Sequence, residues 1–160
     1  MIGHEAKPQI SSARPQVTAA VMEQTDLDED VLRELVHRFY GKVRADPLLG
    51  PIFDERIADW DRHLKRMAEF WSSVALMTGR YHGQPVPAHA PLPVDASHFG
   101  RWLDLFCETA REVCTPAGAT HLIERAERIA QSLHIAVELH KAPPGAAPSF
   151  PPLLKGCRDA

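Results

Sequence analysis

The sequence lacks an apolar run long enough to span a membrane, and its first residues, MIGHEAKPQISSARP, lack the apolar core of a signal peptide. It has three cysteines in 160 residues and no CxxC pair, so structural zinc is not expected. It also lacks a face or terminus rich in lysine and arginine, and the net charge of −3 argues against a nucleic-acid partner. These absences favour a cytoplasmic protein with no membrane span and no nucleic-acid partner.

The spacing of the cysteines opposes a disulfide within a helix. Cys107 and Cys114 fall on one face of an expected helix, separated by about 10 Å along its axis. A disulfide requires Cα atoms within about 7 Å of each other. We therefore expect the cysteines to be free thiols.

The chain divides into three parts by composition. Residues 1–24 are weakly patterned and are expected to form a loose N-terminal extension. Residues 25–140 carry the periodic apolar positions and are long enough to bury a core as one domain. Residues 141–160 form a proline-rich C-terminal tail without a period, expected to be disordered or to lie on the surface.

Four segments show apolar residues at helical spacing, and no segment alternates with the period of a strand, so the domain is expected to be all-α. Each segment begins or ends at residues typical of helix termini. A tight corner, PLLGPIF, follows the first segment. We expect helices from Thr25 or Asp26 to before Pro47, over about 56–78 with Gly79 as its end, from a cap at Asp95 to Cys114, and from Pro116 to about His140.

The connection between the second and third helices is long, stiff and irregular. The stretch PVPAHAPLP, residues 85–93, surrounds His89 with prolines, which fix φ and remove amide donors. We expect no ordinary helix or sheet ladder through it. The prolines would limit the swing of an imidazole that is well suited to be an axial metal ligand. The alternative is that His89, one of nine histidines, lies on a surface loop.

Three polar side chains are expected on the inward faces of three different helices: Tyr40, His63 and Trp102. Each also has a plain interpretation as a core residue with a satisfied hydrogen bond. An apolar cavity with a few donors would suit a diatomic ligand held over a metal. The sequence has no HxxxH motif and no pair of ExxH motifs of the di-iron type, so its side chains alone do not define a site for a free ion. The residues leave open the possibility of one histidine that ligates the metal of a large flat cofactor. The surrounding apolar positions are Phe39, Phe53, Leu64, Met67, Phe70, Trp71 and Phe99.

Three runs of the sequence resemble the truncated hemoglobins of the third group. They are FYGKVRADPLLGPIF, DWDRHLKRMAEFWSSV and YHGQPVPAHAPLPVDASHFGRWLDLF, and the resemblance covers about residues 28–137. It implies a truncated globin fold, a two-over-two helical sandwich around heme b (iron protoporphyrin IX), with flexible extensions at both ends.

The resemblance also implies roles for individual residues. It makes His89 the proximal iron ligand, Tyr40 the distal tyrosine, His63 the distal-position residue and Trp102 the tryptophan of the third helix. Met67 would face the ligand one turn after His63. The full set of expected cofactor-binding residues is His89, Tyr40, His63, Met67, Phe70, Trp102, Phe53 and Leu92.

The implied function is reversible binding of O2, with CO and NO as other ligands, and oxygen transport as the family role. An alternative is a heme enzyme, an NO dioxygenase or a peroxidase-like protein, which would need an external reductase. A heme-free helical interaction module is a third interpretation. The sequence leaves open whether His63 binds the iron as a sixth ligand and whether His89 has a carboxylate or a carbonyl partner.

Overall fold

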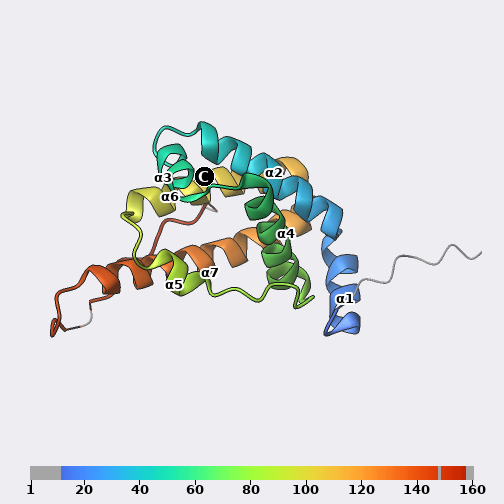
Figure 1. Ribbon diagram of the computed structural model, residues 1–160. Helices are drawn as coiled ribbons and strands as arrows, with labels where there is room; N and C mark the ends of the chain where they lie inside the picture. Colours follow the sequence, from blue (N-terminus) through green and yellow to red (C-terminus); the bar gives the residue numbers. More distant parts are fainter. Residues whose placement is uncertain (1–11, 148, 158–160) are drawn as a thin grey trace, which may run out of the picture.

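The structure, a computed structural model, describes residues 12–147 and 149–157 (Figure 1). Within these residues the chain is helical and forms no strand, so the all-α expectation is confirmed. The helices are α1 Pro15–Thr25, α2 Glu29–Ala45, α3 Gly50–Arg56, α4 Trp60–Leu76, α5 Pro85–His89, α6 Ala96–Val113 and α7 Pro116–Lys141.

The four long helices form two packed layers. α2 packs on α4, α6 packs on α7, and the pairs are joined by contacts of α2 with α6 and of α4 with α7. In Figure 1, α2 runs along the top and α4 passes across α7 below it. Fully buried leucine, valine and phenylalanine side chains fill the space between the layers: Leu32, Leu35, Val36, Phe39, Val43, Leu103, Phe106 and Leu122. This is the two-over-two sandwich that the sequence led us to expect.

The starts of the last two long helices agree with the sequence. α6 begins after Asp95, whose side chain accepts from a first-turn amide, and α7 begins at Pro116. The first long helix differs, because its cap is Asp28 rather than Thr25 or Asp26. The Asp28 carboxylate accepts from the amide three residues on at 2.8 Å. Several acidic residues in a row all suit a helix start, so only the geometry decides between them.

Part of the N-terminal extension is ordered, contrary to the expectation of a loose segment. Residues 15–25 form α1, which packs on α4 and α7, while residues 1–11 lie outside the described residues. The buried hydroxyl of Thr18 donates to the carbonyl oxygen of Leu76 at 2.6 Å, at the end of α4. A single buried hydrogen bond from a threonine gives no periodic apolar pattern in the sequence, so α1 was not predicted.

α4 is shorter at both ends than the expected range of about 56–78. Asp59 caps its N-terminus by accepting from the amide of Arg62 at 3.1 Å. Its C-terminus ends at Met77, which takes the left-handed conformation with φ 59°, and Gly79 follows with φ 74°. The sequence predicted that the helix ends at Gly79, because glycine adopts the left-handed conformation most readily. Met77 adopts it two residues earlier, in a conformation that is strained for a methionine.

The corner after α2 is organised by the buried side chain of Asp46, which is 6% exposed. One carboxylate oxygen accepts from the amides of Leu48 and Leu49, and the other accepts from Arg101 of α6 at 2.7 Å. Gly50 is required next, because a Cβ there would lie 2.7 Å from the carbonyl oxygen of Arg44. The expected corner therefore exists, but it leads at once into the short helix α3.

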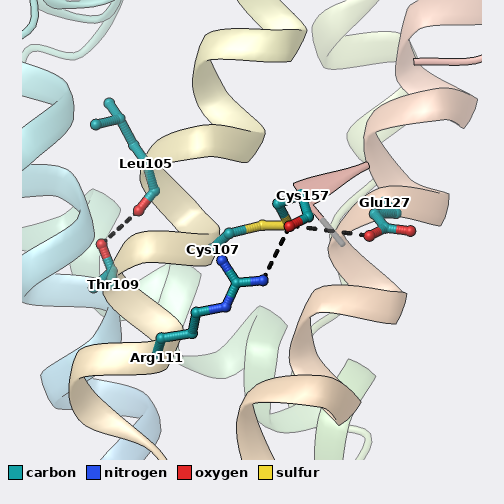
Figure 2. Close-up of a disulfide and its surroundings, with 6 residues drawn as sticks. All are labelled: Leu105, Cys107, Thr109, Arg111, Glu127 and Cys157. Carbon is teal, nitrogen blue, oxygen red and sulfur yellow. Dashed lines mark hydrogen bonds between the residues drawn. A yellow bond between two sulfur atoms is a disulfide. The ribbon is translucent and has the colours of Figure 1, made fainter. Parts of the chain in front are cut away.

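The C-terminal tail turns back after α7 and returns to α6 (Figure 1). Its described residues end at Cys157, which forms a disulfide with Cys107 of α6 (Figure 2). The expectation of free thiols is therefore wrong for this pair and confirmed for Cys114. Spacing along one helix excluded the pairing of Cys107 with Cys114, but it gave no information on a tail 50 positions away.

The Asp46 corner allows a test of stability. Burial alone would raise the pKa of Asp46, but the hydrogen bonds from Arg101, Leu49 and Leu48 lower it below its usual range. Because the folded pKa is lowered, the stabilisation is complete above the pKa of the unfolded chain and is lost as the pH falls through the folded value. We expect Asp46→Asn to lower the free energy of unfolding by about 1–2 kcal/mol at pH 7, measured by urea unfolding.

Asp54→Asn is the matched control for this prediction. Asp54 is an exposed carboxylate 3.8 Å from the guanidinium of Arg44, also exposed, so its removal is expected to change stability by less than about 0.5 kcal/mol. Equal effects of Asp46→Asn and Asp54→Asn at pH 7 would contradict the assigned role of the corner.

Candidate functional site

One cavity opens between α2, α3, α4, α5, α6 and α7. Its empty space is about 950 Å³ when the open mouth is included, and its lining is mostly apolar. All of the eight residues that the sequence indicated line it, namely Tyr40, Phe53, His63, Met67, Phe70, His89, Leu92 and Trp102. Their contacts with a cofactor remain a prediction.

His89 is held by a single helical turn, α5, that begins at Pro85. The expectation that no helix could run through this stretch is wrong for these five residues. The first amides of a helix have no partner within it, so Pro85 and Pro87 at the first and third positions cost no hydrogen bond. The amide of Ala90 donates to the carbonyl of Val86 at 3.0 Å and closes the turn. The prolines thus build the turn rather than prevent it.

The His89 imidazole has a defined partner on one side. Its Nδ1 lies 2.6 Å from the carbonyl oxygen of Pro85, four residues earlier. A carbonyl oxygen only accepts, so Nδ1 carries the proton and Nε2 keeps its lone pair. The ring is half-buried and lines the cavity, which makes Nε2 a suitable metal ligand. The partner that the sequence left open is therefore a backbone carbonyl.

His63 of α4 also lines the cavity, and its polar atom has no protein partner. Its Nε2 is buried without a hydrogen-bond partner among the described residues. Burial lowers the pKa of His63, and the nearby charge of Arg66 lowers it further. A neutral imidazole that lines a cavity and has an unpartnered nitrogen is the chemistry expected where a ligand completes the hydrogen bonding.

Tyr40 and Trp102 are oriented by contacts with one phenylalanine. The ring of Phe39 meets the rings of Tyr40 and Trp102 edge-on, with centroids 5.1 and 5.3 Å apart. Tyr40 also meets His63 edge-on at 5.1 Å. Burial raises the pKa of Tyr40, so its phenol stays protonated and is a hydrogen-bond donor at neutral pH.

Sequence reasoning missed part of the cavity lining. Tyr81 and Pro85, from the segment before His89, and His98 of α6 were not singled out. Pro85 was visible as part of the proline stretch, but its carbonyl carries no sequence signal. Trp71 and Phe99 line the cavity, as expected of the apolar residues around the three polar side chains. Other lining residues had been predicted only as core or corner positions: Leu49, Ile52, Ile129 and Leu133.

The donor set fits an iron porphyrin better than a free ion. Among the described residues, no group of three or more histidine, cysteine or carboxylate side chains could hold a metal. One histidine nitrogen in an apolar cavity requires a cofactor that brings its own remaining ligands. The lining area is dominated by aromatic and aliphatic side chains, as a flat apolar macrocycle needs.

Comparison with known families decides the class of the protein. A model of the bacterial-like globins matches residues 22–136, most of the helical part of the chain. The chain belongs to this family. The region that matches begins within α1 and ends within α7, so it includes all the elements that line the cavity.

Individual relatives place this globin near the third group of truncated hemoglobins. It is 34% identical over 109 residues to the group 3 truncated hemoglobin ctb of Campylobacter jejuni, covering 65% of this chain and 86% of that protein. It is 31% identical over 80 residues to the group 2 truncated hemoglobin YjbI of Bacillus subtilis, covering 48% of this chain and 60% of that one. The sequence-based resemblance is confirmed.

A solved structure supports the same grouping. The crystal structure of the group III truncated hemoglobin from Campylobacter jejuni matches this globin with a TM-score of 0.65 and 33% identity, over 68% of this chain and 89% of that one. Membership of the family identifies this globin as a heme-binding protein. None of the helices that the structure describes combines the length and apolar character needed to cross a bilayer.

The environment of His63 gives a titration test. In the heme-free chain we expect His63 to take up a proton only below its ordinary pKa of 6.5. Its contribution to stability is then complete above about pH 6.5 and is lost as the pH falls through the lowered value. Histidine NMR signals of the wild type and of His63→Gln, followed against pH, identify the His63 midpoint. A midpoint at or above that of the urea-unfolded chain would contradict the assigned burial.

Proposed function

We propose that this globin binds O2 reversibly at a heme b whose iron is ligated by His89, with CO and NO as alternative ligands. The observation that carries the proposal is the pairing of a fixed imidazole with an unpartnered one in a single cavity. His89 keeps its Nε2 lone pair free because Nδ1 is bound to Pro85, and His63 presents a buried Nε2 without a partner.

The protein would hold the cofactor by apolar contacts with the cavity wall and by one bond from the His89 imidazole to the iron. His89 would supply the nitrogen ligand, and Phe53, Phe70 and Leu92 would supply apolar contact area within the same cavity. Bound heme supplies the iron centre at which a diatomic ligand binds. The residues around it exclude water and choose between ligands by polarity.

Donors in the cavity favour a ligand that gains negative charge when bound. The protonated Tyr40 phenol and the indole N–H of Trp102 can each donate a hydrogen bond to such a ligand and so stabilise it. His63 is a further donor or acceptor, depending on its tautomer. A ligand that stays neutral and apolar gains less from these groups, so the polarity of the site favours O2 over CO.

The partner of His89 favours ligand binding over catalysis. A carboxylate at Nδ1 would draw the proton away and increase electron donation to the iron, which assists O–O cleavage. The Pro85 carbonyl is a weaker base and leaves the proton on Nδ1. The alternative, an NO dioxygenase or peroxidase-like enzyme served by an external reductase, therefore has less support from this geometry.

Tyr40→Phe tests the role of the distal donor. The change removes one hydrogen bond to a charged group, of about 1.5–3 kcal/mol, so the O2 dissociation rate is expected to rise roughly 10–100-fold. Stopped-flow displacement of O2 by excess CO measures this rate in the reduced protein.

Tyr81→Phe is the matched control, because Tyr81 also lines the cavity but comes from the segment that carries His89. We expect the O2 dissociation rate of this variant to stay within about twofold of the wild type. If Tyr40→Phe and the wild type release O2 at the same rate, Tyr40 does not bind the ligand and the proposed distal arrangement is wrong.

A further inference from the structure

The tail after α7 is attached mainly at its end. Phe150 and Leu153 are 67% and 85% exposed, although both are large apolar residues. The attachment begins at Leu154, whose amide donates to the side-chain oxygen of Gln131 on α7 at 2.9 Å, and it finishes at buried Cys157. Most of the described residues of the tail before Leu154 are therefore exposed, and residues 154–157 form a short anchored segment.

The disulfide in this anchored segment has a distinctive setting (Figure 2). Arg111 lies one turn after Cys107 on α6, and its guanidinium donates to the carbonyl oxygen of Cys157 at 3.0 Å. Glu127 of α7 lies on the other side, with a carboxylate oxygen 4.0 Å from the Cys157 sulfur. The bond thus joins α6 to the tail, and Glu127 of α7 lies beside it.

A hollow in the surface reaches the disulfide from outside. Both cysteines line it, together with the cations of Arg111 and Lys155. A disulfide sealed inside a core cannot meet an external thiol, whereas one at the base of a hollow can. Of the two cysteines, Cys157 is the more exposed, at 8% against 1% for Cys107.

We propose that Cys107–Cys157 is an exchangeable disulfide, which a small monothiol opens through the hollow and so releases residues 154–157 from α6 and α7. The small thiolate attacks the sulfur of Cys157 and forms a bond with it. The bond to Cys107 breaks, and its electron pair leaves with Cys107 as a thiolate that is protonated by water. A second small thiolate then attacks the mixed disulfide, releases Cys157 as a thiolate and leaves as a small-molecule disulfide.

The reverse reaction re-forms the Cys107–Cys157 disulfide, with the small-molecule disulfide as the oxidant. The thiolate of one protein cysteine attacks the small-molecule disulfide, and the second cysteine displaces the small thiol from the mixed disulfide. Arg111 and Lys155 favour both directions, because cations beside a sulfur stabilise its thiolate and attract anionic thiols such as glutathione. The carboxylates of Asp104 and Glu108 in the same hollow, and that of Glu127 at 4.0 Å from the Cys157 sulfur, oppose this attraction. Arg111 stays close to Cys157 because its guanidinium is hydrogen-bonded to the Cys157 carbonyl oxygen.

Cys114 serves as an internal reference for this reaction. Burial, together with the charge of Glu34, raises the pKa of the Cys114 thiol to about 11. At neutral pH it therefore has little thiolate and is expected to stay reduced in mixtures that change the state of the other two cysteines.

The test is a redox titration of the full chain in mixtures of reduced and oxidised glutathione at pH 7, without denaturant. After acid quenching, a thiol-alkylating label and intact mass measure the number of free thiols. We expect one free thiol in oxidised mixtures and three in reduced mixtures, with a reversible transition between them. Hydrogen exchange at the Leu154 amide, measured in the same samples, is expected to become at least tenfold faster when the bond opens.

Two variants make the result specific. Cys157→Ser, which leaves buried Cys107 in place, is expected to show fast exchange at Leu154 in every mixture. Cys114→Ser is expected to keep the full transition. A bond that opens only in denaturant, three free thiols in every mixture, or a Leu154 amide equally protected in both states would each overturn the proposal. None of these readouts depends on heme.

Discussion

The hydrogen bond between His89 Nδ1 and the Pro85 carbonyl is the constraint on which the proposed chemistry depends. It fixes the tautomer of the ring, and therefore which nitrogen is free to bind a metal. The bond exists only because α5 makes one helical turn, which brings residue 85 beside residue 89. Prolines at positions that have no amide bond to lose make this turn at small entropic cost. A flexible loop of the same length would leave the imidazole undirected.

The two proposed donors, Tyr40 and Trp102, depend on the packing of the core. Phe39 is almost fully buried and touches Tyr40 and Trp102 on either side, so the two proposed donors are set by the same side chain. The Asp46 corner adds a second link, since it ties the end of α2 to Arg101, the residue before Trp102. The geometry of the distal donors is thus a consequence of how α2 packs on α6.

Much of this structure could be predicted from the sequence, for physical reasons that also explain the omissions. Helical periodicity records which face is buried, so the long helices and the inward position of Tyr40 were predictable. Helical periodicity did not show which inward residues form a common site, whereas resemblance to a family predicted the eight residues that line the cavity. The Pro85 carbonyl has no side chain to signal its role, and the pairing of Cys107 with Cys157 depends on where a patternless tail returns.

The central claim is that His89 is the protein ligand of a bound heme. Its most direct test is a hemin titration of the purified chain, followed by visible spectra of the ferric, dithionite-reduced and CO-bound forms. His82→Ala is the control, because His82 is an exposed histidine close by in the same segment that does not line the cavity. The account predicts a Soret band that shifts on reduction and on CO addition in the wild type and His82→Ala, and that is lost or strongly weakened in His89→Ala. Identical spectra for all three proteins would contradict it.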